Sequence, residues 1–229
     1  MNLSFGSSRK GSAQRGEETR GRILAAAIET FASVGYEAAH TRLLAERAGV
    51  KLPAIPYYFG SKEGLFRAVI ELIAAKVAER MAPAAETGRI ALLDGASPRE
   101  RLLATLCALL DTFVETMLGA EFPASWRLIV ARAEIENLDS LDPLRDCMVR
   151  NMIEPTTSLI ARILGQDEDD EHSWMRAIAI LGQINIFCKP LVCRGLGWDE
   201  YNAERIGAVQ ATVREHVVAI LASGKVPSP

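Results

Sequence analysis

TRLLAERAGVKLPAIPYYFGSKEGLF, residues 41–66, is the stretch of sequence that decides the fold. Thr41 stands where a residue that caps a helix N-terminus is preferred, and Gly49 stands where a helix commonly ends. The apolar residues between them recur at helical spacing and form a short stripe of Leu44, Ala45 and Ala48. This part of the stretch therefore predicts a short helix that stops at Gly49.

Two prolines follow the glycine, and they indicate how the next element begins. Proline lacks an N–H group, and the first turn of a helix does not use that group. A helix that begins near Lys51 or Leu52 therefore tolerates Pro53, whereas Pro56 lies at the edge of tolerance and is expected to leave one carbonyl unpaired. A short helix, a turn around Gly49 and a second short helix form a helix-turn-helix arrangement. The residues expected to pack the two helices together are Ala45, Val50 and Ile55.

Longer helices are predicted on both sides of this motif. Residues 1–16 are rich in Ser and Gly and have no period, so they predict a disordered arm. An amphipathic helix is predicted from Glu17 to Gly35, with its stripe at Ile23, Leu24, Ala27, Ile28 and Phe31. Another is predicted from the N-cap Ser61, with its apolar stripe at Leu65, Phe66, Val69, Ile73, Val77 and Met81.

The rest of the chain predicts further helices and no strand. Residues 82–98 contain two prolines and several small turn residues, which favours a linker there. Helices are expected at about 99–119, 123–137, 142–164, 171–194 and 199–222, with Pro190 kinking or ending the fourth. The fold class is therefore all-α, an N-terminal three-helix helix-turn-helix domain followed by a C-terminal helical bundle. The expected division is a disordered arm 1–16, a helix-turn-helix domain 17–81, a linker 82–98, a helical-bundle domain 99–222, and a tail 223–229.

The net charge of −3 is unevenly distributed along the chain. Residues 1–62 contain nine Lys or Arg and five Asp or Glu, a balance of +4, and the remainder contains seventeen against twenty-four, a balance of −7. A basic N-terminal part on an acidic body indicates that one end meets a polyanion such as nucleic acid.

Several other classes of protein are disfavoured by what the sequence lacks. The four cysteines form no C-x-x-C pair and match no zinc pattern, which favours reduced thiols in a cytoplasmic protein. No apolar run reaches the roughly 18 residues of a membrane span. The three histidines are scattered and no catalytic or phosphate-binding motif occurs, so we expect no enzyme, no cofactor and no metal site.

A family resemblance is carried by residues that occur in one fixed order. Phe31 is followed by Gly35-Tyr36, then by Thr41-x-x-Leu44-Ala45-x-x-Ala48-Gly49-Val50, then by Tyr57-Tyr58-Phe59-x-Ser61-Lys62. Over about residues 18–75 the chain thus resembles the N-terminal domain of TetR/AcrR-type transcriptional regulators. The variant I-x-YYFGSKE is similar to the CecR-like branch of that family.

The resemblance implies that the second short helix enters the major groove of DNA. It implies a base contact for Arg42, whose guanidinium suits bidentate hydrogen bonds to guanine, and phosphate contacts for Thr41, Tyr58 and Lys62. The residues that would face the groove, where apolar contact with thymine methyls is their direct readout, are Leu52, Pro53 and Ala54.

The sequence departs from the family pattern at two positions of the motif, and one of its tyrosines, Tyr57, has no implied DNA contact. Pro56 replaces a Tyr or Thr, so a phosphate hydrogen bond is lost. Lys51 replaces a Ser or Thr cap, which weakens the helix start and adds a charge toward DNA. Tyr57 is expected to belong to the domain core.

The resemblance also implies that the C-terminal body forms a dimer and binds a ligand. The last two helices are apolar widely enough for an intersubunit four-helix bundle. Candidate pocket residues are Phe113, Met117, Trp126, Arg127, Met148, Met152, Gln183 and Phe187. The apolar members could equally be core, and Asn185 could serve as a polar anchor or fix the dimer register.

The sequence therefore predicts a homodimeric, sequence-specific DNA-binding regulator, a repressor released from a pseudo-palindromic operator by a small-molecule effector. The alternative is a ligand-binding or scaffold protein that retains the helix-turn-helix fold without operator binding. Steep dependence of DNA affinity on salt separates the two.

Overall fold

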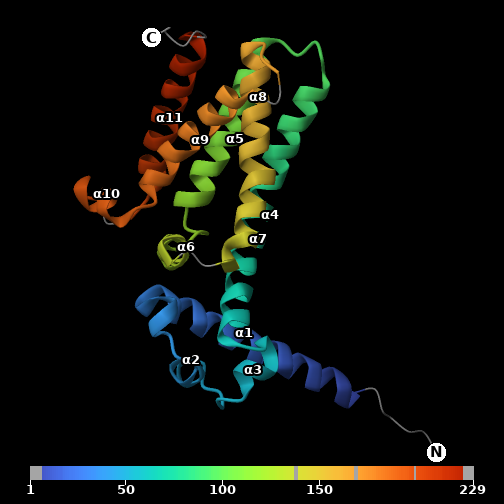
Figure 1. Cartoon of the computed structure of the whole chain (residues 1–229), viewed down its shortest axis with the longest axis vertical. Coiled ribbons are helices and arrows are strands. Elements are labelled where there is room, and N and C mark those ends of the chain that lie inside the picture. The colour runs from blue at the N-terminus through green and yellow to red at the C-terminus, as the bar shows by residue number, and fades with distance from the viewer. Residues whose placement is uncertain (1–6, 137–138, 168–169, 199, 224–229) are drawn as a thin grey trace, which may run out of the picture. The chain divides into compact units, whose positions relative to one another are not determined.

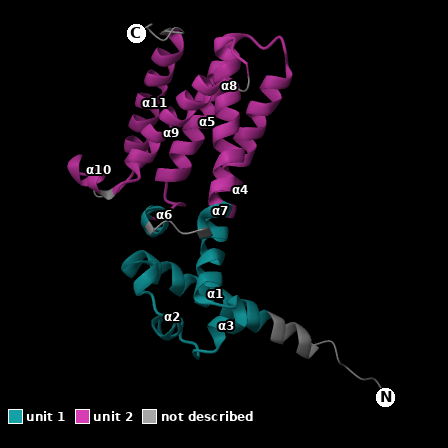
Figure 2. Cartoon of the chain, in the orientation of Figure 1, with its two compact units in different colours: residues 1–73, 124–143 teal, residues 74–123, 144–229 magenta. Residues whose placement is uncertain are grey.

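The computed structural model describes residues 7–136, 139–167, 170–198 and 200–223, and within these ranges every regular element is helical (Figure 1). The prediction of an all-α fold is confirmed. The chain divides into two compact units, residues 1–73 with 124–143 and residues 74–123 with 144–229 (Figure 2). We call them unit 1 and unit 2. Among the described residues, no helix is long and apolar enough to cross a membrane, and no cluster of three or more His, Cys, Asp or Glu could hold a metal ion.

Unit 1 contains the helix-turn-helix motif. Its elements are α1 (Ser7–Ala38), α2 (Thr41–Arg47), α3 (Ala54–Phe59), the start of α4 (Lys62–Leu93), α6 (Ala124–Glu136) and η1 (Asp139–Leu141). The aromatic rings of Phe31, Tyr36 and Phe66 form its centre, with ring centroids 5.0–6.0 Å apart. Helix α6 packs along α1, and there Arg132 donates a hydrogen bond to the carbonyl of Ser33 at 3.4 Å.

The expected disordered arm is partly wrong, because α1 begins at Ser7 and residues 7–16 are helical. The serines and glycines of this segment are poor helix formers. They extend a helix that is already nucleated by its buried face further on, where Ile23, Ala27 and Phe31 are buried. Residues 1–6 lie outside the described residues. The helix is interrupted at Gly35, with φ 81°, where the sequence predicted its end.

Unit 2 is a bundle built from the remainder of α4 and the later helices. These are α5 (Arg99–Leu118), most of α7 (Asp142–Met148), the π-helical turn η2 (Val149–Ile153), α8 (Glu154–Leu164), α9 (Glu171–Phe187), α10 (Pro190–Gly195) and α11 (Ala203–Ser223). Helix α5 packs between α8 and α11, and α9 contacts all three (Figure 1). Helix α11 buries an apolar stripe at Val209, Val213 and Val217.

The observed division differs from the expected one at the linker. Helix α4 continues through Pro83 to Leu93, so only residues 94–98 connect it to α5. Pro83 is exposed, whereas Met81 and Ala85 on the other face are buried. The missing hydrogen bond thus falls on the solvent side, where a helix tolerates it by bending.

Two further differences concern the C-terminal helices. Residues 124–143, expected in the C-terminal domain, group with unit 1 because α6 packs on α1. The helix expected at 171–194 ends at Phe187, and Pro190 opens α10 as its first residue, so the predicted effect of Pro190 is confirmed. The helical run at 142–164 is observed, with the π-helical turn inside it. The expected tail lies outside the described residues from position 224 onward.

Candidate DNA-binding site

The turn between α2 and α3 is set by a glycine. After α2 the amide of Gly49 donates to the carbonyl of Glu46 at 3.1 Å, and the amide of Val50 donates to the carbonyl of Ala45 at 3.0 Å. This pair of hydrogen bonds is typical of a helix C-terminus at which the first residue beyond the cap has a positive φ. Gly49 is that residue, and its φ is 62°. A glycine is required here because a side chain strains that conformation.

The second helix begins later than predicted. Helix α3 starts at Ala54 with Pro53 as its N-cap, because the amide of Ala54 bonds the carbonyl of Lys51 at 2.9 Å and closes a turn first. Pro56 is then the third helical residue, within the first turn, where an amide has no intrahelical partner. The unpaired carbonyl expected from Pro56 is not observed, since the carbonyl of Leu52 accepts from the amide of Ile55 at 3.4 Å.

The start of α2 also differs from the prediction. Its N-cap is His40, which makes no side-chain capping bond, and Thr41 is the first helical residue. By contrast Ser61 caps α4 as predicted, since its hydroxyl oxygen accepts from the amide of Gly64 at 3.0 Å. Of the residues expected to pack α2 on α3, Ala45 and Ile55 are buried and Val50 is half-buried.

Most of the predicted DNA-contacting residues lie on the surface of α2, the turn and α3. Arg42, Lys51, Leu52 and Pro53 are exposed, Leu52 to 51%, and Thr41 and Ala54 are half-buried. The exposed part of this motif thus combines two cations with an apolar side chain at the turn that precedes α3. We refer to Arg42, Lys51, Leu52, Pro53 and Tyr57 as the recognition face.

The two tyrosines of α3, of which Tyr57 was expected in the core and Tyr58 at a phosphate, differ in their exposure. Tyr57 is 80% exposed, so its placement in the core is wrong. Tyr58 is half-buried, and its hydroxyl lies near Gly16 of α1, at 3.9 Å from where a β-carbon on that glycine would stand. Sequence periodicity could have found this, because Tyr57 follows the buried Ile55 by two residues and so lies on the opposite side of the helix.

Lys62 is held by the end of α1. Its ammonium group donates to the carbonyl of Tyr36 at 2.9 Å and to that of Glu37 at 3.5 Å, and lies 4.1 Å from the centroid of the Tyr36 ring. These contacts make Lys62 a link between α1 and α4. Its predicted phosphate contact would have to compete with them.

Other cations of unit 1 also have structural partners. Arg47 donates to the hydroxyls of Thr30 and Ser33 at 3.3 and 3.1 Å, and the Arg20 guanidinium lies 5.2 Å from the centroid of the Phe59 ring. Arg42 and Lys51, by contrast, make no hydrogen bond or ion pair within the part of the chain that the structure describes. These two are therefore the cations of the recognition face.

The candidate pocket residues do not form one group. Trp126 and Arg127 lie on α6 in unit 1, and the others lie in unit 2. Phe113 and Met152 are buried, and Met117, Met148, Gln183 and Phe187 are half-buried. None of the eight lines the cavity that unit 2 contains beside Arg80.

The cysteines are free thiols in buried or half-buried positions. Burial raises the pKa of the Cys107 and Cys147 thiols. A raised pKa disfavours the reactive thiolate, so these two positions are not suited to sensing oxidants.

Comparison with known proteins assigns families to both parts of the chain. Residues 23–69 match the family of bacterial regulatory proteins of the tetR type, and residues 98–224 match the C-terminal domain of the HTH-type transcriptional dual regulator CecR. The second match covers more than half of the chain.

Individual relatives agree with this assignment. The chain is 27% identical to the transcriptional dual regulator CecR of Shigella flexneri over 213 residues, 90% of this chain and 93% of that protein. It is 29% identical to the transcriptional activator FasR of Mycolicibacterium smegmatis over 175 residues, 76% of this chain and 72% of that protein. A TetR-like regulator from Rhodococcus sp. RHA1 shares the fold, with a TM-score of 0.60 and 22% identity over 89% of this chain and 96% of that one. The chain therefore belongs to the TetR family, in the branch that carries the CecR C-terminal domain, and is a DNA-binding regulator of transcription and not an enzyme.

Proposed function

We propose that this regulator acts as a homodimer that places one α3 helix in each half-site of a pseudo-palindromic operator. The observation that carries the proposal is the recognition face, where the cations Arg42 and Lys51 and the side chains of Leu52 and Tyr57 are all exposed on α2, the turn and α3. Cations attract the phosphate backbone, and apolar groups at the tip of a helix read the methyl groups of thymine.

The roles of individual residues follow from their positions. We propose that Arg42 forms paired hydrogen bonds to guanine, and that Thr41 and Lys51 contact phosphates. Leu52, Pro53 and Ala54 would supply the apolar contacts in the groove. Tyr57 is added to this set because its side chain is exposed. Tyr58 and Lys62 keep their proposed phosphate contacts, and to make its contact Lys62 would have to leave the carbonyls of Tyr36 and Glu37.

Dimerisation is supported by apolar side chains left on the surface of unit 2. On α9, Met175, Ile178 and Ile186 are exposed and lie with Gly182 on one face, at spacings of three and four residues. On α11, Val218 is exposed and lies on one face with Ala211, Glu215 and Ala222. We propose that these two faces meet their copies in a four-helix bundle.

The direction of regulation is proposed as repression that a small-molecule effector relieves. An effector that binds one conformation of the dimer more tightly than the other shifts the population toward that conformation. The affinity for the operator then changes by an amount that the difference between the two effector affinities limits. The names of the relatives include both a dual regulator and an activator, so the sign is a property to be measured. We place the protein in the cytoplasm, where its operator would be found.

The test is selection of bound fragments from the source genome by the purified protein, at moderate salt with excess non-specific DNA. We expect recovery of one inverted repeat whose half-sites are separated by about one helical turn or a multiple of it. Recovery of no sequence, together with weak binding, would instead support a protein that retains the fold and acts through unit 2 alone.

A further inference from the structure

Unit 2 contains a cavity of about 540 Å³, within the range of small-molecule sites. Its walls come from α4, α5, the segment that follows α5, the segment before α11, and α11 itself. Part of the lining is apolar: Gly119, Ala120, Ala203, Ile206 and the ring of Tyr201. The remainder is polar: Arg80, Glu115, Glu121 and Gln210.

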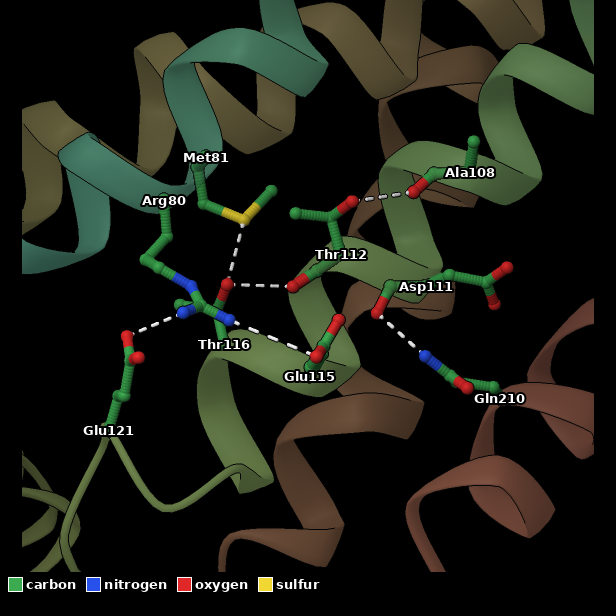
Figure 3. A network of polar contacts seen from close by, with 9 residues as sticks. All are labelled: Arg80, Met81, Ala108, Asp111, Thr112, Glu115, Thr116, Glu121 and Gln210. Atoms are coloured by element: carbon green, nitrogen blue, oxygen red, sulfur yellow. Dashed lines mark hydrogen bonds and ion pairs between the residues drawn. The ribbon is translucent and has the colours of Figure 1, made fainter. Parts of the chain in front are cut away.

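Two polar lining residues are already engaged within unit 2. The hydroxyl of Tyr201 donates to the carbonyl of Phe187 at 2.5 Å. The side-chain amide of Gln210 donates to the carbonyl of Asp111 at 3.1 Å (Figure 3). Tyr201 therefore contributes its aromatic ring to the cavity more than its hydroxyl, and the charged groups that remain are those around Arg80.

The charges of the lining do not balance. The Arg80 guanidinium forms a hydrogen-bonded ion pair with Glu121 and lies 4.0 Å from a carboxylate oxygen of Glu115 (Figure 3). One positive and two negative groups leave a net charge of −1. A bound monocation brings the lining to zero, whereas a bound monoanion raises the imbalance to −2 and must take Arg80 away from both carboxylates.

The ion pairs of Arg80 are exposed to solvent, so replacing one partner by another costs little free energy. The side chains of Arg80, Glu115 and Glu121 are 36%, 60% and 75% exposed. Exposed pairs contribute little net free energy, because water solvates the separated ions well. An incoming cation can therefore take one of these carboxylates at low cost, and the ring of Tyr201 adds a surface that attracts cations.

We propose that this cavity is an effector site for an organic monocation with an apolar body, whose charged group binds Glu115 and Glu121. The proposal rests on the proposed function, since it gives the chemical class of the effector. The apolar body would lie against Ala203, Ile206 and Tyr201.

The position of the ion pair explains how such a ligand would act on the rest of the chain. Arg80 lies on α4, which runs without a break from unit 1 into unit 2. Glu121 lies three residues before Ala124, where α6 of unit 1 begins. The Arg80–Glu121 ion pair thus links two of the segments by which the chain passes between the units. A cation that replaces Arg80 on Glu121 would break this link.

The experiment measures binding to the full-length protein without DNA, using three fluorescent probes. Each carries the dansyl fluorophore on the same alkyl arm, which ends in an ammonium, a hydroxyl or a carboxylate group. We expect the ammonium probe to bind about threefold more tightly than the hydroxyl probe, the usual scale for an ion pair with exposed carboxylates, and the carboxylate probe to bind most weakly.

Variants locate the effect in the cavity. Glu115→Gln combined with Glu121→Gln keeps the shape of the lining and is expected to abolish the preference for the ammonium probe. Arg80→Gln leaves both carboxylates free for the ligand and is expected to strengthen the preference for the ammonium probe. The matched control is Glu86→Gln, which removes an exposed carboxylate paired with Arg89 on the same helix outside the cavity lining. Circular dichroism melting of each variant checks that the fold is retained.

The proposal would be overturned by equal affinity for the three probes, by tightest binding of the carboxylate probe, or by a preference that survives the double variant. Absence of binding by all three probes would overturn it as well. A separate measurement adds the ammonium probe to the protein on its selected operator. Binding in the cavity without a change in operator affinity would contradict effector control in the proposed function and leave the charge selectivity of the cavity standing.

Discussion

At the scale of single residues, Gly64 shows how closely the chain approaches itself at the start of α4. A β-carbon at this position would lie 2.0 Å from the carbonyl oxygen of Phe59, a backbone atom that cannot move aside alone. We expect Gly64→Ala to lower the free energy of unfolding by roughly 1–3 kcal/mol, the usual cost of overpacking. Urea denaturation followed by circular dichroism measures the change.

The matched control for this substitution is Gly21→Ala. Gly21 lies exposed within α1, and a β-carbon there meets no atom within 4 Å. Alanine is a better helix former than glycine, so this change is expected to raise the free energy of unfolding by about 1 kcal/mol. Equal effects of the two substitutions would contradict a steric role for Gly64.

Arg42 and Lys51 are expected to contribute to operator binding in different ways. Arg42→Ala should weaken binding by roughly 1–3 kcal/mol and relax the preference at one base pair, because a base contact is lost. Lys51→Ala should weaken binding evenly across sequences and reduce the salt dependence by about one phosphate contact. Titration of operator variants at several salt concentrations separates the two.

The control for these two variants is Arg101→Ala, which removes an exposed cation of α5 that pairs with Asp94. It should leave operator affinity and its salt dependence unchanged. If Arg42→Ala behaved like this control, the base contact assigned to Arg42 would be wrong.

At the scale of elements, the start of α9 depends on a carboxylate cap. Asp170 accepts a hydrogen bond from the amide of Ser173 at 2.7 Å, and hydrogen bonding with Ser173 lowers the pKa of Asp170 from its usual value of 3.8. A lowered pKa in the folded state means that the stabilisation is present above the unfolded-state pKa and is lost as pH falls through the folded-state value. The cap is therefore expected to weaken below about pH 4.

Asp170→Asn tests this pH dependence, because asparagine also caps helices and does not titrate. We expect the stability advantage of the native chain over this variant to shrink as the pH is lowered from about 5 to about 3 in urea denaturation. Asp167→Asn removes a charge from the same segment without changing the cap and is the control. A constant difference between the native chain and Asp170→Asn across this range would contradict the assignment.

At the scale of the whole molecule, the exposed apolar face of α9 is expected to hold two copies together. Ile186→Glu places a charge on that face and should shift the protein from dimer to monomer in sedimentation equilibrium. Operator affinity should fall with it, because a monomer engages one half-site only. Leu93→Glu is the control, since Leu93 is 85% exposed at the end of α4 and lies outside the α9 and α11 faces.

A dimer that survives Ile186→Glu unchanged would indicate a different interface. A monomer that still selects the full inverted repeat with the affinity of the native protein would contradict the two-half-site arrangement. The two measurements therefore test the interface and its consequence for DNA binding separately.

The sequence by itself determined the features that rest on local interactions. Gly49 ends α2 and Ser61 caps α4 because the bonds that form these caps join residues three to five positions apart. The buried stripes of α1, α4 and α11 follow from helical periodicity. The order of residues in the helix-turn-helix is specific enough to identify the family, because each residue is required by a turn, a cap or a buried contact within the same short segment.

Only the tertiary structure decided the features that depend on distant partners. Helix α4 continues through Pro83 because its other face is buried in unit 2, which local propensity cannot report. Lys62 is held by carbonyls of α1 that lie some 25 residues earlier in the chain. The cavity around Arg80 combines side chains from three parts of the chain, which no spacing in the sequence brings together. Local bonding fixes where helices begin and end, and long-range burial fixes which faces meet.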